Sequence, residues 1–125
     1  MDNGQWEMKK ENVVRDKSFD FAVRVVNAYK YLADKKREFV MSQQLLRSGT
    51  AIGALVREAE QAESKTDFVH KMSIALKEAN ETDYWLDLLY KTDYFGENEY
   101  QSLKADAVEL LKLLVSIINS SKRNN

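Results

Sequence analysis

The chain of 125 residues has the length of one domain and contains neither cysteine nor proline. The missing cysteine excludes thiol catalysis, disulfides and cysteine-bound metal sites, while four glycines and no proline favour helix throughout. Nineteen basic and twenty acidic residues give a net charge of -1, which argues against a nucleic-acid-binding protein that relies on bulk positive charge but allows a local basic patch.

The first helix is expected after a loose polar arm at residues 1–12, which lacks the apolar core of a secretory signal. Ser18 is placed to cap this helix, which runs to about Lys36. Two apolar stripes run along it side by side. The first contains Phe19, Ala22, Val26, Tyr29 and Ala33, and the second contains Phe21, Val25, Ala28 and Leu32.

The second helix is expected from about Met41 to Glu63, with apolar or small residues at steps of three and four. Gly49 and Gly53 lie four residues apart on it. In a protein without a membrane span this spacing predicts a close crossing of two helix backbones. Arg47 lies in the middle of the least charged stretch. An arginine at the centre of a membrane span costs about 2.5 to 3.5 kcal/mol, so this stretch is a poor candidate for a span and we expect a soluble, cytoplasmic protein.

The third helix is expected to begin at Lys65, because Ser64 and Asp67 have the spacing of a capping box. Gly96 ends this helical region and Asn98 can start a fourth helix. The third helix carries one regular apolar stripe: Phe68, Met72, Ala75, Ala79, Thr82, Leu86 and Leu89. The fourth carries two stripes: Leu103, Ala107, Leu110, Leu114 and Ile117, then Val108, Leu111, Val115 and Ile118.

Four helices with short connections predict an all-α fold, an antiparallel up-down-up-down four-helix bundle over residues 13–120 with a frayed tail at 121–125. The first and fourth helices each carry more apolar surface than one bundle can bury, so we expect a homo-oligomer. The expected interface residues are Phe21, Val25 and Leu32 on the first helix and Leu111, Val115 and Ile118 on the fourth.

A metal site is not expected. His70 follows Asp67 by three residues, which superficially resembles half of a di-iron site. A di-iron centre needs a second acid–histidine pair and further carboxylates that the pattern does not supply. His70 is therefore expected at a helix surface.

Glu78 and Glu81 share one face of the third helix, where partial burial would shift their pKa values. Paired carboxylates with shifted pKa values can carry out acid–base catalysis. Neither histidine nor cysteine accompanies them, whereas Arg47 and Glu58 lie three turns apart on one face of the second helix. We therefore expect a structural ion-pair network of these four residues, in which Arg47 forms a buried pair with Glu78 or Glu81. No catalytic residue, cofactor or small-molecule substrate is expected.

Basic residues are densest near the start of the chain. Lys9, Lys10, Arg15 and Lys17 are candidates for phosphate contacts, especially if an oligomer gathers several copies. A solvated charged arm is the alternative interpretation.

The sequence resembles a family of small bacterial four-helix-bundle proteins encoded within intervening sequences of 23S ribosomal RNA, also labelled S23 ribosomal proteins. The resemblance covers about residues 10–120. It rests on QLLRSGTAIGA (44–54), EA (58–59), SKTDF (64–68) and IALKEANETDYWL (74–86). Ala51 and Leu55 depart from the family pattern, in which Ser and Asn commonly stand, so any polar network of those side chains is reduced here.

The resemblance implies an antiparallel bundle that forms rings, with five subunits in the related accessory variability proteins of diversity-generating retroelements. Those relatives work with a reverse transcriptase and nucleic acid and are strongly basic, unlike this chain. The leading hypothesis is a non-enzymatic homo-oligomer, with five subunits as the best single expectation, that binds RNA or a ribonucleoprotein. The alternative is a protein-interaction module without nucleic acid.

Overall fold

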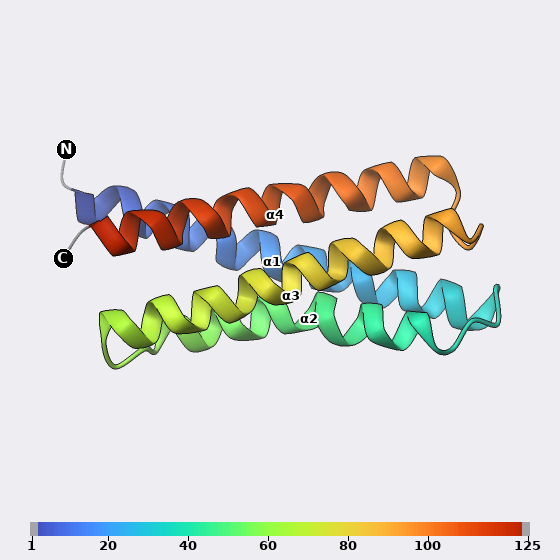
Figure 1. Cartoon of the computed structure of the whole chain (residues 1–125), viewed down its shortest axis with the longest axis horizontal. Helices are drawn as coiled ribbons and strands as arrows, with labels where there is room; N and C mark the ends of the chain where they lie inside the picture. Colours follow the sequence, from blue (N-terminus) through green and yellow to red (C-terminus); the bar gives the residue numbers. More distant parts are fainter. Residues whose placement is uncertain (1–2, 124–125) are drawn as a thin grey trace.

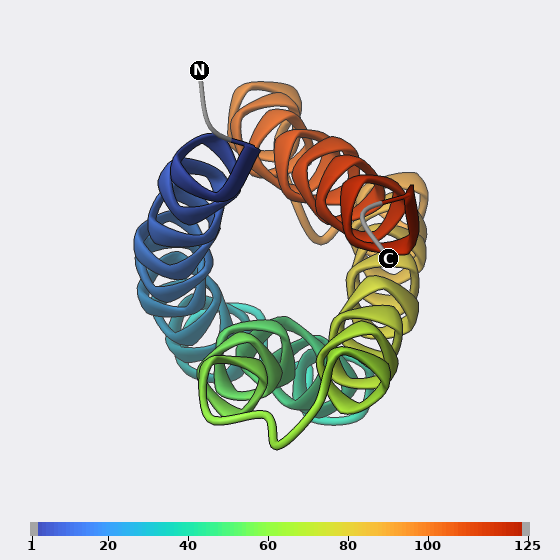
Figure 2. The same cartoon turned by 90° about the vertical axis from the view of Figure 1, so that its left-hand side faces the viewer.

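The computed structural model describes residues 3–123, with side chains from Lys9 onward. Four helices follow one another: α1 (Asn3–Asp34), α2 (Met41–Glu60), α3 (Lys65–Lys91) and α4 (Glu97–Arg123). Each helix packs against two neighbours, and the contacts join α1 to α2, α2 to α3, α3 to α4 and α4 back to α1. Figures 1 and 2 show the resulting antiparallel up-down-up-down bundle, which confirms the predicted fold.

The first helix is longer than the sequence pattern predicts. α1 begins at Asn3, so residues 3–12 are helical rather than a loose arm. Ser18 is not a cap, because it lies inside α1, fully buried, and its Oγ donates to the carbonyl of Arg15 at 3.0 Å. At the other end of the chain, α4 includes residues 121–123, and Ser121 is buried rather than frayed. The rest of the predicted arm and tail, residues 1–2 and 124–125, lies outside the described residues.

The core contains the second stripe of α1. Phe21, Val25 and Leu32 are at most 1% exposed, so the prediction that these three residues form an interface is wrong: they lie in the core of their own bundle. Ile118 of α4 is buried as well, and the same correction applies to it. The first stripe of α1 is the more exposed one. The core of the described residues also includes Leu45, Ile52, Val56, Met72, Ala75, Ala79, Leu86, Leu89, Leu110 and Leu114.

The α1–α2 crossing is close, as the glycine spacing predicts. A Cβ at Gly49 would lie 2.7 Å from Cγ1 of Val25, and a Cβ at Gly53 would lie 3.4 Å from the backbone carbonyl oxygen of Ser18. Glycine at these positions lets α2 approach α1 without a side chain between them.

The start of α2 and the start of α3 are capped in different ways. Ser64 Oγ accepts from the backbone N–H of Asp67 at 3.0 Å, and Asp67 accepts in return from the N–H of Glu63, which confirms the predicted cap. At α2, the carboxylate of Glu38 accepts from three successive backbone N–H groups, those of residues 40, 41 and 42, at 2.7 to 3.1 Å. These N–H groups have no partner within the helix, so Glu38 stabilises its first turn.

Candidate functional site

Arg47 of α2 reaches both predicted acids of α3. Its Nη1 lies 3.1 Å from Glu78 Oε2 and its Nη2 pairs with Glu81, whose Oε2 also accepts from Trp85 Nε1 at 3.0 Å. The bonds from Trp85 and Arg47 hold the pKa of Glu81 below its usual range, and the bond to Glu81 raises the pKa of Arg47. The arrangement keeps the charges ionised and paired, which suits a link between helices rather than proton transfer.

This ion pair is not buried, contrary to the sequence-based expectation. The side chain of Arg47 is 49% exposed, and those of Glu78 and Glu81 are 20% and 38% exposed. Glu58, the fourth predicted member, pairs instead with Lys71 of α3 at 3.1 Å. The network is therefore two separate links across the α2–α3 surface.

His70 lies exposed on α3. Within the part of the chain whose side chains are described, residues 9–123, no group of three or more histidine, cysteine, aspartate or glutamate side chains is arranged to hold a metal ion.

A second polar cluster joins α3 to α4 and was missed by the sequence analysis. Lys104 Nζ lies 2.7 Å from Asp83 Oδ1 and 2.9 Å from Asp87 Oδ1, and the hydroxyl of Tyr100 donates to Asp87 at 2.6 Å. The ring of Tyr100 stacks on that of Tyr90, with centroids 4.1 Å apart. The available signal was the matching spacing of four residues, Asp83 to Asp87 on one helix and Tyr100 to Lys104 on the other.

The predicted phosphate-binding residues are largely engaged within the chain. Lys17 Nζ lies 2.9 Å from Glu109 of α4, and this hydrogen bond raises the pKa of Lys17. Arg15 lies 3.3 Å from Asp16 and 3.9 Å from Glu60, and Lys10 donates to the hydroxyl of Ser116. These contacts fasten α1 to α2 and α4 and reduce the positive charge available to a ligand.

Two of the apolar surfaces on the outside of the bundle lie along its helices, within the residues whose side chains are described. On α1, Val13, Phe19 and Val23 are 40 to 51% exposed, and the guanidinium of Arg57 lies 5.3 Å from the Phe19 ring centroid. We call this surface the α1 stripe.

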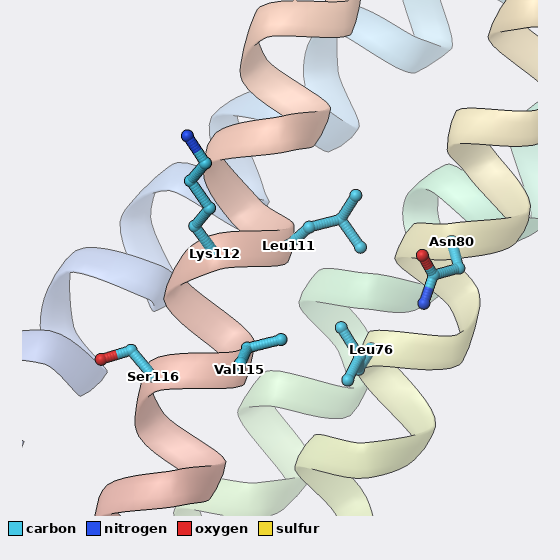
Figure 3. A pocket seen from close by; sticks show the side chains of 6 residues that line it. All are labelled: Leu76, Asn80, Leu111, Lys112, Val115 and Ser116. Carbon is cyan, nitrogen blue, oxygen red and sulfur yellow. The ribbon is translucent and has the colours of Figure 1, made fainter.

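The other surface is a hollow of about 410 Å³ between α3 and α4. We call it the α3–α4 hollow; its lining consists of Leu76, Asn80, Leu111, Lys112, Val115 and Ser116. Leu111 and Val115 extend from α4 toward α3, which contributes Leu76, while Lys112 and Ser116 point away from α3 (Figure 3). Two predicted interface residues, Leu111 and Val115, thus line an open apolar surface.

None of the helices in the described part of the chain is long and apolar enough to cross a membrane. The comparison with curated proteins finds no significant match. Among solved structures, the chain is similar to a protein of unknown function from the S23 ribosomal protein family of Bacteroides thetaiotaomicron, with 60% identity, a TM-score of 0.87 and coverage of 88% of this chain and 98% of that one. The model of a family described as 23S rRNA-intervening sequence protein matches residues 10–116. The chain therefore belongs to the 23S rRNA-intervening sequence protein family, as its motifs predict.

Proposed function

We propose that this protein is a non-enzymatic, cytoplasmic homo-oligomer whose subunits join by placing the α1 stripe of one subunit into the α3–α4 hollow of the next. The observation that carries the proposal is the presence of these two apolar surfaces on one bundle. Exposed apolar patches rimmed by polar residues are typical of protein–protein interfaces. The absence of cysteine fits a reducing compartment.

The two surfaces lie on different sides of the bundle. α1 packs side by side with α2 and α4, whereas α3 lies across the core of the bundle from it. In the end-on view of Figure 2, α1 and α3 lie on opposite sides of the bundle, and α4 lies beside both of them. Two different complementary surfaces produce head-to-tail contacts, which close into a ring when the rotation between subunits permits. A ring of five subunits remains our best single expectation, on the resemblance to ring-forming relatives.

One pair of charges beside the two surfaces has opposite signs. Asp20 is exposed on α1 between Phe19 and Val23, and Lys112 borders the α3–α4 hollow. In the proposed contact the apolar side chains supply the centre, and these charges lie at the rim, where they favour one orientation.

The non-enzymatic part of the proposal is supported by the pairing of the acids. Glu81 and Asp87 are both held ionised by hydrogen-bond donors, so neither is poised to exchange protons near neutral pH.

RNA, free or in a ribonucleoprotein, is the partner that we propose for the oligomer. The family description, which refers to an intervening sequence of 23S rRNA, supports this choice. The net charge of -1 favours the second candidate, a protein-interaction module without nucleic acid.

The assembly is tested with two variants, Val23→Glu in the α1 stripe and Val115→Glu in the hollow. Both positions are exposed, so both variants should fold. Light scattering coupled to gel filtration should show an oligomer for the parent protein and a mass near 14.5 kDa for each variant alone. Each variant keeps one intact surface, so an equimolar mixture should form a dimer of twice that mass and nothing larger.

Val40→Glu is the matched control, since Val40 is exposed but belongs to neither surface. This variant should keep the parent mass. A monomeric parent protein would overturn the assembly, and variants that stay monomeric when mixed would overturn the pairing of these two surfaces.

A further inference from the structure

The turn between α1 and α2, residues 35–40, combines positive charge with exposed apolar side chains. Lys35, Lys36 and Arg37 are all exposed. Phe39 is 46% exposed and Val40 is 75% exposed, the highest value for a large apolar side chain among the described residues. We call these five residues the basic turn.

The acid within this segment is removed from the surface. Glu38 is 8% exposed, and its carboxylate is occupied by the backbone N–H groups at the start of α2. Capping α2 therefore has a second effect: the Glu38 carboxylate bonds to the backbone of α2 and forms no ion pair with Lys35, Lys36 or Arg37. Asp34, directly before Lys35, is also exposed. The three exposed cations outnumber this one exposed acid, so the surface of the segment has a net positive charge.

The cations of the basic turn are available to a ligand, in contrast to most of those near the start of α1. Lys35, Lys36 and Arg37 form no ion pair within the described part of the chain. Their contacts are with rings: Lys36 Nζ lies 5.9 Å from the Tyr31 centroid, and the Arg37 guanidinium lies 5.2 Å from the Phe39 centroid. A half-exposed ring with a guanidinium beside it is a stacking surface next to a phosphate-binding group.

Arg37 has a left-handed backbone, with φ of 55°. Glycine and asparagine adopt this conformation at lower cost; here it ends α1, because the N–H of Glu38 after it bonds back to the carbonyl of Leu32 at 3.0 Å. The side chain of Arg37 leaves this cap beside the ring of Phe39.

We infer that the basic turn is a binding surface for single-stranded RNA, in which the three cations contact phosphates and a base stacks on Phe39. This inference rests on the RNA partner proposed above and assigns it to a surface other than the start of α1. A ring of subunits would present one basic turn per subunit, so a single RNA could engage several turns at once, which raises the overall affinity.

The opposite charge at the same end of the bundle favours a single strand. The α1–α2 and α3–α4 turns lie at the same end (Figure 1), where Asp93 of the α3–α4 turn and Glu97 and Glu99 at the start of α4 are exposed. A duplex or an anionic bilayer is broad enough to meet both turns and would be repelled by these acids. A single strand is narrow enough to follow the basic turn alone.

The test measures fluorescence anisotropy with a labelled oligouridylate of about 12 nucleotides. The Lys35→Glu, Lys36→Glu, Arg37→Glu triple variant should lose binding. The matched control carries Lys65→Glu, Lys77→Glu and Arg123→Glu, which change the net charge equally at exposed positions away from the turn, and it should bind nearly as the parent does. Thermal unfolding by circular dichroism checks that both variants fold.

Salt dependence and stacking give independent readouts. Three phosphate contacts on a single strand predict a slope of about -2 in log affinity against log salt, or about a twentyfold loss between about 50 and 200 mM. Phe39→Ala should weaken binding by roughly fivefold to a hundredfold without changing that slope, because it removes a stacked base and no charge.

Several results would overturn the inference. Equal losses in both triple variants would mean that only bulk charge matters. Loss on charge reversal at Lys9, Lys10, Arg15 and Lys17 alone would place the RNA at the start of α1 and leave the proposed RNA partner intact. Tighter binding of duplex RNA, or binding of phosphatidylserine vesicles but not RNA, would give the turn another ligand. An oligomeric protein without any RNA affinity would overturn both this inference and the RNA partner, but not the assembly.

Discussion

Gly49 of α2 lies so close to Val25 of α1 that the two residues determine how far apart the helices stand. A Cβ at Gly49 would meet both Val25 methyl carbons, at 2.7 and 2.8 Å. Val25 is fully buried and β-branched, so it has little freedom to move aside. Gly53, one turn further along α2, has ordinary contact distances to Ser18.

Gly49→Ala should therefore destabilise the protein, whereas Gly53→Ala should not. Overpacking at Gly49 is expected to cost about 1 to 3 kcal/mol. Gly53→Ala gains up to about 1 kcal/mol of helix propensity without a clash. Denaturant unfolding of both variants measures the difference, and Val25→Ala combined with Gly49→Ala should be more stable than the two separate losses add up to. Equal stability of the two single variants would contradict the close crossing.

Arg47→Leu should cost about 0.4 to 2 kcal/mol, because it removes two partly exposed ion pairs and exposed pairs contribute about 0.2 to 1 kcal/mol each. The loss should shrink at high salt, since salt screens exposed charges. Chemical denaturation by urea at low and high salt measures it. Lys77→Leu on exposed α3 is the control and should change stability less. A cost of several kcal/mol that salt does not alter would indicate a buried pair.

A negative charge at Phe21 and one at Phe19, which belong to the two different apolar stripes that the sequence predicts along α1, should have different consequences. Phe21→Glu puts a carboxylate into the core and should unfold the protein, because an unpaired buried charge is not tolerated. The side chain of Phe19 is 51% exposed, so Phe19→Glu should give a folded monomer in place of the proposed oligomer. Circular dichroism separates unfolding from dissociation, and light scattering gives the mass. An unfolded Phe19 variant would mean that this ring supports the bundle itself.

The two stripes of α1 also show where sequence reasoning ends. Both repeat with the helical period, so periodicity alone cannot decide which one faces inward. The decision depends on α2, where Gly49 and Gly53 accept Val25 and Ser18. α3 was easier, because it has one regular stripe, and Met72, Thr82 and Leu89 are indeed buried.

Polar contacts were predictable in part. The position of Glu78 and Glu81 on one face of the third helix predicted Arg47 as their partner, and the structure brings Arg47 to both acids. The prediction that the pair is buried was wrong, since exposure depends on how neighbouring helices pack. The cap by Glu38 was missed because its carboxylate reaches the start of α2 from outside the helix, a position to which no simple spacing rule applies.

The α3–α4 cluster predicts how stability depends on pH. Burial alone raises the pKa of the Asp87 carboxyl, but hydrogen bonds from Tyr100 and Lys104 outweigh it and hold this pKa below its usual value. A lowered folded-state pKa contributes stability above the unfolded-state value, about 4, and this contribution is lost as the pH falls through the folded-state pKa.

The alkaline side has the opposite sign. The hydrogen bond to Asp87 raises the pKa of Tyr100, and the bonds to Asp83 and Asp87 raise the pKa of Lys104 against the effect of burial. Raised values contribute stability that is complete below the unfolded-state pKa of about 10 and is lost as the pH rises through the folded-state values. The free energy of unfolding should therefore be highest between these limits. Asp87→Asn should lower it there and flatten both slopes, because it removes the carboxylate that Tyr100 and Lys104 share.

Asp93→Asn is the matched control. Asp93 lies exposed in the α3–α4 turn with φ of 70°, a conformation that asparagine tolerates well. Urea unfolding from about pH 3 to 11 compares the parent with both variants. Parallel curves for the parent and Asp87→Asn would show that this cluster does not control the pH dependence, whereas a curve flattened by Asp93→Asn as well would assign it to general charge rather than to Tyr100, Lys104 and their shared acid.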